Sequence, residues 1–243
     1  MDRPNKPLGQ KNYGSIAHLP GSRRGPGDHT CHEGQARIAT IEPRDRHDEI
    51  IVQEKLDGSN VGVALIDGAL HPLSRSGYPA RSSPYRMHHL FDEWVWQNQD
   101  RFLAVLNEGE RLVGEWMAQA HGTRYDWTGD PFVAFDLMFR TKRTPYDEFV
   151  NRVSAGLFVI PALIHRGDPI SISDAMDKIG IYGFHGALEP VEGAVWRVER
   201  DKQIVKHARE RRRVVDFLVK YVRPDKIDGK YLDGDPVWNW LPQ

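Results

Sequence analysis

The feature that most constrains the fold is a stretch of β-type sequence between residues 49 and 73. The residues EIIVQEKL predict a strand that leads into a lysine, and the glycine of Lys55-Leu56-Asp57-Gly58 permits a tight turn directly after it. VGVALIDGALHPL follows, with Asp67-Gly68 between two apolar runs, which strongly indicates a β-hairpin. This stretch therefore predicts an antiparallel sheet and a lysine held at the end of a strand, where its side chain can face a cleft.

The rest of the chain alternates between strand-like and helix-like segments. We expect further strands at residues 36–42, 110–119, 131–139, 156–165, 193–200 and 214–222. Ser83 and Pro84 predict the start of a long helix that ends near residues 107–109, and Ser173 is expected to cap a short helix before Gly180. Mixed strands with interspersed helices favour an α+β fold, with antiparallel sheets flanked by helices, over a doubly wound sheet.

The composition excludes several classes of protein. Hydrophobic residues make up 40% of the chain and charged residues 28%, as in ordinary globular proteins. No stretch approaches the roughly 18 to 20 apolar residues of a membrane helix, and the first residues lack the apolar core of a secretory signal. The single cysteine, Cys31, excludes an internal disulfide. We therefore expect a cytoplasmic protein with no membrane partner, while the oligomeric state stays open.

The net charge of −1 conceals a segregation of charge along the chain. Residues 194–213 contain eight lysines and arginines against three acids, and residues 75–86 contain three arginines and no acid. A basic surface for phosphate groups is therefore available despite the balanced total.

Chemically suggestive residues recur where apolar runs meet glycine or end. A lysine such as Lys55 becomes a nucleophile only after it loses its proton, which nearby cations or burial favour. Four later segments place a charged residue in or at the end of an apolar run, and they are Gly114-Glu115, Phe135-Asp136, Glu192-Gly193 and Val215 to Tyr221, which contains Lys220. Taken singly, each of them is also typical of plain strand architecture.

Together and in this order, these segments resemble the covalent nucleotidyltransferases, the superfamily of ATP-dependent ligases and mRNA capping enzymes. The matching motifs are Lys55-Leu56-Asp57-Gly58 (motif I), Gly114-Glu115 (III), Phe135-Asp136 (IIIa), Glu192-Gly193 (IV) and Lys220 (V). Within the superfamily, Glu54-Lys55 followed by Gly58-Ser59-Asn60, and the residues AFDL, are most similar to RNA ligases. The resemblance covers roughly residues 50–223 and implies the ATP-grasp-like catalytic domain of these ligases.

The resemblance implies a role for each matching residue. Lys55 would attack the α-phosphate of ATP, Lys220 would neutralise that phosphate in the transition state, and Glu192 would hold a divalent cation, Mg²⁺ or Mn²⁺. Glu115 would accept a hydrogen bond from a ribose hydroxyl, and Phe135 would stack on adenine. The other implied nucleotide-binding residues are Glu54, Asn60 and Arg75, of which Arg75 would contact ribose or a substrate phosphate.

The activity implied by the resemblance is that of an ATP-dependent RNA ligase in RNA repair. Such an enzyme joins 5′-phosphate and 3′-hydroxyl ends through a covalent lysyl-AMP and an adenylylated 5′ end, so nucleic-acid ends are the expected partners, with RNA favoured over DNA. Two alternatives stay open. One is a DNA nick-sealing ligase or another self-adenylating nucleotidyltransferase, and the other is a non-catalytic module that binds nucleotides or nucleic-acid ends.

The sequence departs from the family pattern in two places. Motif V usually has two lysines, but Leu218 occupies the first position. Either Lys206, in the preceding basic stretch, supplies the missing charge, or the site needs only one lysine. The residues after motif V are too few for the appended domain of many relatives. We expect an N-terminal extension packed on the catalytic domain (1–49), the nucleotidyltransferase domain itself (50–223), and a tail without an OB or helical C-terminal domain (224–243).

Overall fold

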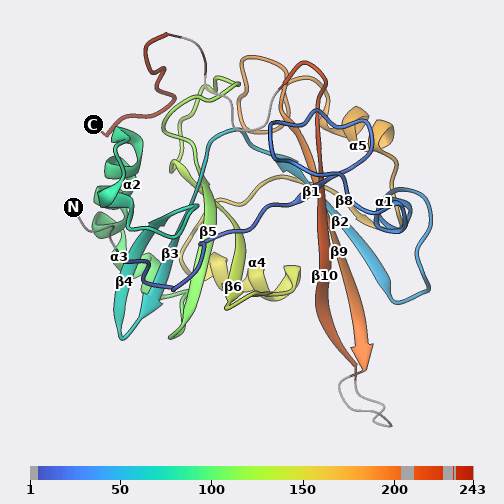
Figure 1. Cartoon of the computed structure of the whole chain (residues 1–243), viewed down its shortest axis with the longest axis horizontal. Coiled ribbons are helices and arrows are strands. Elements are labelled where there is room, and N and C mark those ends of the chain that lie inside the picture. Colours follow the sequence, from blue (N-terminus) through green and yellow to red (C-terminus); the bar gives the residue numbers. More distant parts are fainter. Residues whose placement is uncertain (1–4, 204–210, 227–231, 233, 243) are drawn as a thin grey trace.

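The computed structural model describes residues 5–203, 211–226, 232 and 234–242. Within these ranges the strands form two five-stranded sheets, which lie side by side in Figure 1. Sheet A has the order β1 (Ala17–His18), β10 (Arg211–Val222), β9 (Gly193–Gln203), β2 (Asp48–Lys55) and β8 (Leu163–Gly167). Sheet B has the order β4 (Ala69–Ser74), β3 (Ser59–Ile66), β5 (Glu110–Trp116), β6 (Phe132–Phe139) and β7 (Lys142–Arg143).

The chain first passes from sheet A to sheet B at a short turn after the predicted strand, and it returns to sheet A between β7 and β8. Strand β2 ends at Lys55 in sheet A and β3 begins at Ser59 in sheet B, so residues 56–58 connect the two sheets. Neighbouring strands pair antiparallel, apart from β1, which runs parallel to β10. The α+β class with antiparallel sheets is thus confirmed, and the lysine lies where the sheets meet.

The predicted hairpin is present as β3–β4. Asp67 and Gly68 both have positive φ, 51° and 73°, as a two-residue hairpin turn requires. The Glu108 carboxylate accepts hydrogen bonds from the backbone N–H groups of Asp67, at 2.6 Å, and Gly68, at 3.0 Å. The turn therefore sets the register that continues into the cross-strand pairs of β3 and β5.

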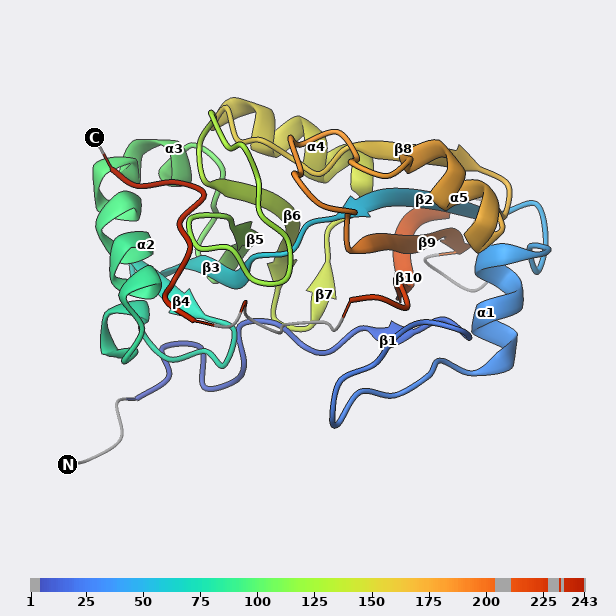
Figure 2. The same cartoon turned by 90° about the horizontal axis from the view of Figure 1, so that it is seen from above.

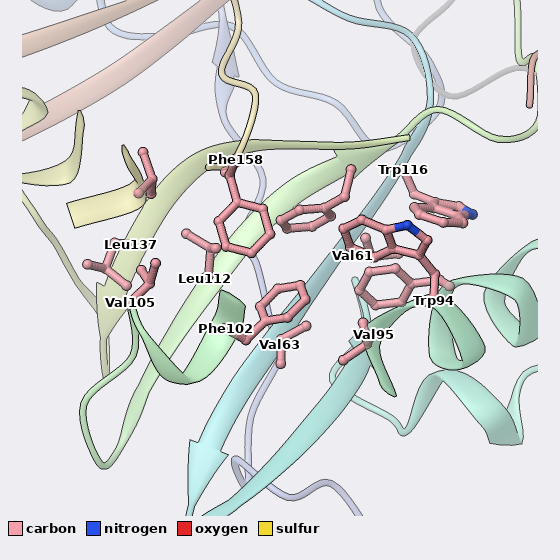
Figure 3. Close-up of a cluster of buried hydrophobic side chains, with 14 of the residues drawn as sticks. Val61, Val63, Trp94, Val95, Phe102, Val105, Leu112, Trp116, Leu137 and Phe158 are labelled. Atoms are coloured by element: carbon pink, nitrogen blue, oxygen red, sulfur yellow. The ribbon is translucent and has the colours of Figure 1, made fainter. Parts of the chain in front are cut away.

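An aromatic core covers one face of sheet B. Helices α2 (Arg86–Gln97), α3 (Gln99–Leu103) and α4 (Tyr146–Ala155) contribute to it (Figure 1). Trp94, Phe102, Trp116 and Phe158 lie together in Figure 3, and the Phe102 and Phe158 ring centroids are 4.7 Å apart. Rings buried in this way contribute large apolar areas, so this core anchors the strands of sheet B.

A second core packs against sheet A. Helices α1 (Glu33–Thr40) and α5 (Ile172–Ile179) bury Ala39 and Ile179 against Val52, Trp196 and neighbouring strand residues. Figure 2 shows α1 and α5 together at the end of the molecule opposite α2. Among the described residues, no helix combines the length and the apolar character that crossing a bilayer requires.

Residues 36–42 were expected to form a strand, and this expectation is wrong, because most of them belong to helix α1. Ala36 and Ala39 lie three residues apart and both face the second core. The Gln35 side chain accepts a hydrogen bond from the His32 backbone N–H, which helps to begin the helix before the apolar run.

The boundaries of two other helices also differ from the expected ones. A 3-10 turn, η1 (Ala80–Ser82), precedes Ser83, and Ser83 stays extended before proline, so α2 begins only at Arg86. The long helix is interrupted at Asn98, whose side chain donates a hydrogen bond to the Trp94 carbonyl at 2.9 Å. Helix α5 is capped by Ser171, two residues earlier than Ser173, because the Ser171 hydroxyl accepts from the Asp174 N–H at 3.1 Å.

Candidate active site

The β2–β3 turn holds the predicted nucleophile rigidly. A Cβ atom at Gly58 would lie 2.6 Å from the Trp116 carbonyl oxygen, so only glycine allows this close approach of the turn to β5. The Asp57 carboxylate is buried and accepts a hydrogen bond from the Gly122 N–H at 2.9 Å, while the Asp57 N–H donates to the Tyr125 hydroxyl. Burial raises the pKa of Asp57.

Lys55 forms an ion pair with Glu192. The Lys55 Nζ lies 2.5 Å from the Glu192 Oε2, and the carboxylate is almost completely buried. Lys55 lies opposite Gly193 in the β2–β9 register, which places the residue before Gly193 beside the lysine. The sequence predicted both residues from segments 137 positions apart, and the structure brings them together.

Lys220 lies on the neighbouring strand of the same sheet. It pairs with Val195 in the β9–β10 register and is 5% exposed. A Cβ atom at Gly193 would fall 1.9 Å from the Tyr221 carbonyl oxygen, so glycine lets β9 approach β10 closely at this point. Lys55 and Lys220 therefore lie on β2 and β10, and Glu192 directly precedes β9, the strand between them.

Sheet B contributes the residues on the other side of the cleft. Asn60 and Glu115 are cross-strand partners in the β3–β5 register. The Glu115 Oε1 accepts a hydrogen bond from the Gly58 N–H at 3.2 Å, which ties this carboxylate to the nucleophile turn. The Asn60 Oδ1 is buried without a hydrogen-bond partner among the described residues, which leaves one acceptor for a ligand.

Phe135 and Asp136, adjacent on β6, are held in different ways. Phe135 is half-buried, and its ring meets Tyr13 edge-on with centroids 5.3 Å apart. Asp136 is fully buried and accepts from Tyr13, Arg143 and Arg197. Burial alone would raise the pKa of Asp136, but the charges of Arg197 and Arg143 outweigh it and hold the pKa below its ordinary value.

Two further predicted residues border the same cleft. Arg75 is exposed, with its Nη2 3.4 Å from the Ser15 hydroxyl. Glu54 is buried, and its Oε2 accepts from the Phe184 N–H at 3.0 Å and contacts His185 Nδ1 at 2.9 Å. The structure therefore binds one oxygen of Glu54 to the loop before β9, while its Oε1 is buried without a hydrogen-bond partner among the described residues.

A single cavity of about 1020 Å³ joins these residues. Its lining includes most of the predicted site, namely Glu54, Lys55, Asn60, Arg75, Glu115, Phe135 and Lys220. Glu192 lies behind Lys55 and contacts it through the ion pair. Cavities of about 300–1,000 Å³ hold small-molecule ligands, so this space suits a nucleotide.

The departure from motif V is visible in the cavity wall. Leu218 lines the cavity where relatives usually have a lysine, and it pairs with Arg197 in the β9–β10 register. The Arg197 guanidinium also borders the cavity, but it is bound to Asp136. Lys206, the alternative source of positive charge, lies outside the described residues.

Sequence reasoning missed Tyr13 and Arg197 as parts of the site. Tyr13 lies in the expected N-terminal extension, before the first motif, and Arg197 lies within an ordinary strand pattern. Both act through Asp136, which is 123 residues from Tyr13 and 61 residues from Arg197. No local pattern indicates such contacts.

The residues present fit a divalent cation bound mainly by water. Among the described residues there is no group of three or more His, Cys, Asp or Glu side chains that could hold a metal ion. Mg²⁺ usually takes only one or two protein carboxylates and several waters, and Glu192 offers a carboxylate beside Lys55.

Comparison with known proteins identifies the group to which this architecture belongs. A family model described as RNA ligase matches residues 48–239, well over half of the chain. Among curated proteins, none matches this sequence.

Solved structures share the fold at low sequence identity. A mutant of Naegleria gruberi RNA ligase with ATP and Mn matches with a TM-score of 0.55 and 13% identity, over 87% of this chain and 58% of that one. The Naegleria gruberi RNA ligase with PPi matches with a TM-score of 0.52 and 14% identity, over 87% of this chain and 57% of that one. An archaeal ATP-dependent RNA ligase matches with a TM-score of 0.45 and 16% identity, over 84% of this chain and 48% of that one.

This chain thus spans about half to three fifths of the length of those solved chains. The family match covers the nucleophile turn and all five motif segments, and the first two structures show the same fold. The resemblance seen in the sequence is confirmed: the chain belongs to the RNA ligase family.

Proposed function

We propose that this protein is an ATP-dependent RNA ligase that joins 5′-phosphate and 3′-hydroxyl ends through a lysyl-AMP intermediate. The observation that carries the proposal is that Lys55 and Lys220 share one cavity with Glu115 and Phe135, while Glu192 pairs with Lys55. Family membership supports the same activity.

In the first step, Lys55 Nζ forms a bond to the α-phosphorus of ATP. The bond from that phosphorus to the bridging oxygen breaks, pyrophosphate leaves with the electron pair, and Nζ loses a proton to give a phosphoramidate with an uncharged nitrogen. The ion pair with Glu192 holds Lys55 as an ammonium, which has no lone pair, so the lysine must release its proton and leave this carboxylate before it attacks.

Other residues hold the nucleotide while this bond forms. Lys220 lies one strand beyond β9 and stabilises negative charge on the α-phosphate. Glu115 and Asn60 offer hydrogen-bond acceptors to ribose, and Phe135 offers a ring face to adenine. A divalent cation at Glu192, Mg²⁺ or Mn²⁺, would supply positive charge next to the triphosphate.

Two further steps complete the joining of strands. The 5′-phosphate of a nucleic-acid end attacks the lysyl-AMP phosphorus, the N–P bond breaks, and Lys55 takes up a proton. The 3′-hydroxyl then attacks the 5′-phosphorus of the activated end and loses its proton. A phosphodiester forms, the bond from that phosphorus to the oxygen bridging it to AMP breaks, and AMP leaves with the electron pair. We assign these steps to residues 50–223, with residues 1–49 packed on this unit and residues 224–243 as a tail.

We also expect a cytoplasmic location, because the chain has a single cysteine, which suits a reducing compartment.

The proposal is tested by incubating the protein with α-labelled ATP and Mg²⁺. We expect the wild type to gain a covalent label and Lys55→Ala to gain none, because the phosphoramidate nitrogen is then missing. Lys202→Ala serves as a control, since Lys202 is half-exposed on β9 and pairs with Asp216. Labelling of Lys55→Ala at the wild-type level would contradict the proposal, and ATP binding without label would indicate a non-catalytic module.

Nicked RNA, DNA and mixed duplexes then distinguish the acceptors. We expect sealing of RNA to exceed sealing of DNA. Efficient sealing of nicked DNA alone would instead identify a DNA nick-sealing enzyme.

A further inference from the structure

The segment before the first long strand crosses both sheets. Residues 10–19, which we name the N-terminal strap, run beside sheet B and then join sheet A as β1, as Figure 2 shows. This strap lies outside the residues that match the RNA ligase family model. Five of its residues, Lys11, Tyr13, Gly14, Ser15 and Ile16, nevertheless line the large cavity.

The strap contacts sheet B through closely fitted backbone. The Asn12 carbonyl accepts a hydrogen bond from the Arg111 Nε at 2.7 Å. A Cβ atom at Gly77 would lie 2.1 Å from the Gln10 carbonyl oxygen, and φ at Gly77 is +87°, so glycine is required for this approach. The Tyr13 N–H also faces the Arg75 carbonyl at 3.4 Å.

The strap reaches sheet A beside the lysine of motif V. His18 lies opposite Lys220 in the β1–β10 register, and the Leu19 N–H donates to the Lys220 carbonyl at 2.8 Å. One short segment therefore touches Arg75, which follows β4, Phe135 on β6 and Lys220 on β10, so it contacts both sheets.

Tyr13 is the side chain through which the strap contacts β6. It is 4% exposed, its ring meets the Phe135 ring at an interplanar angle of 72°, and its hydroxyl donates to Asp136 at 2.6 Å. The Arg143 guanidinium lies over the Tyr13 ring, 5.1 Å from the ring centroid. Tyr13 is thus held at its ring and at its hydroxyl, and it cannot rotate away without breaking both contacts.

We propose that Tyr13 is a positioning residue of the nucleotide site, which fixes the Phe135 ring for stacking on the nucleobase while the rest of the strap fixes Lys220. This inference rests on the proposed function, because it assigns the base to Phe135. A phenyl ring that is only half-buried gains a fixed orientation from an edge-on partner, and a fixed ring binds a base at a smaller entropy cost.

The test measures ATP binding by calorimetry on a Lys55→Ala background, where no covalent step follows binding. Tyr13→Met removes the ring but retains flexible apolar volume, and Tyr13→Phe retains the ring without the hydroxyl. We expect Tyr13→Met to weaken ATP binding about tenfold and Tyr13→Phe by less than about threefold, because the ring contact dominates. We also expect Tyr13→Met to reduce the preference for ATP over GTP.

Tyr146→Met is the matched control, because Tyr146 is also buried beside a phenylalanine, with centroids 6.5 Å apart, but lies on α4 outside the cavity lining. It should lower stability and leave the dissociation constant of ATP unchanged. An unchanged dissociation constant in Tyr13→Met, an equal effect of Tyr146→Met, or no ATP binding by Lys55→Ala would overturn the inference. Intact ATP binding with no covalent label on the wild type would overturn the proposed ligase activity alone.

Discussion

Sheets A and B are alike in size and construction but differ in the chemistry that they bring to the cleft. Each buries one face against helices. Sheet A contributes Lys55 and Lys220, with Glu192 paired to Lys55 directly before β9. Sheet B contributes Phe135 and the hydrogen-bonding side chains of Asn60 and Glu115. In the proposed reaction, sheet A therefore acts on the phosphates and sheet B on the nucleoside.

This division requires that the sheets keep a fixed separation. The β2–β3 turn joins them covalently, and the buried pair of Asp136 on β6 with Arg197 on β9 joins them through side chains. A charged pair that is this deeply buried contributes little net stability, but breaking it leaves an uncompensated charge. The site therefore depends on the contacts between the two sheets as well as on the residues that each sheet contributes.

The largest expected effect comes from breaking the tie between the sheets. Asp136→Asn should reduce the free energy of unfolding by about 3–5 kcal/mol, because it leaves Arg197 buried without its carboxylate. Urea denaturation at pH 7 measures the loss. Asp147→Asn is the control, since Asp147 pairs with Arg166 at the exposed surface and should change stability by less than about 1 kcal/mol.

The destabilisation caused by Asp136→Asn should depend on pH, and its direction follows from the lowered pKa of Asp136. The ionised carboxylate stabilises the fold above the unfolded pKa of about 3.9, and this contribution disappears as the pH falls through the lower folded value. The stability difference between wild type and Asp136→Asn should therefore be largest near neutral pH and narrow below about pH 4. A constant difference across this range would contradict the assigned ion pair.

The second largest effect is expected from Lys220, the sheet A residue assigned to the α-phosphate. Lys220→Ala should slow formation of the covalent label by about 10²–10³-fold, because charge stabilisation at the α-phosphate is lost. Single-turnover labelling with saturating ATP measures this rate. If Lys220→Ala reacts at the wild-type rate, Lys220 is a structural residue and the assignment of motif V is wrong.

The smallest effect is expected from Phe135, the sheet B residue assigned to the nucleobase. Phe135→Leu should raise the KM for ATP about tenfold while kcat changes little, because base stacking stabilises binding by about 1–3 kcal/mol. Phe139→Leu is the matched control on the same strand, since Phe139 is 47% exposed at the end of β6. A fall in kcat without a change in KM would show that Phe135 acts on the chemical step instead.

Local sequence predicted those parts of the molecule whose causes are local. The hairpin follows from two positive φ values at Asp67 and Gly68, and the turn after Lys55 follows from the steric needs of Gly58. Helix α1 was missed because its apolar residues also fit a strand, and the choice between them depends on packing against sheet A.

The candidate site divides in the same way. The sequence predicted Lys55, Glu115, Phe135, Glu192 and Lys220 as site residues, because the ordered motifs that contain them resemble those of the covalent nucleotidyltransferases. The contact of Tyr13 with Phe135 and the ion pair of Arg197 with Asp136 between the sheets became visible only in the folded chain. Contacts between residues so distant in the chain depend on how the sheets pack, and no short segment encodes that packing.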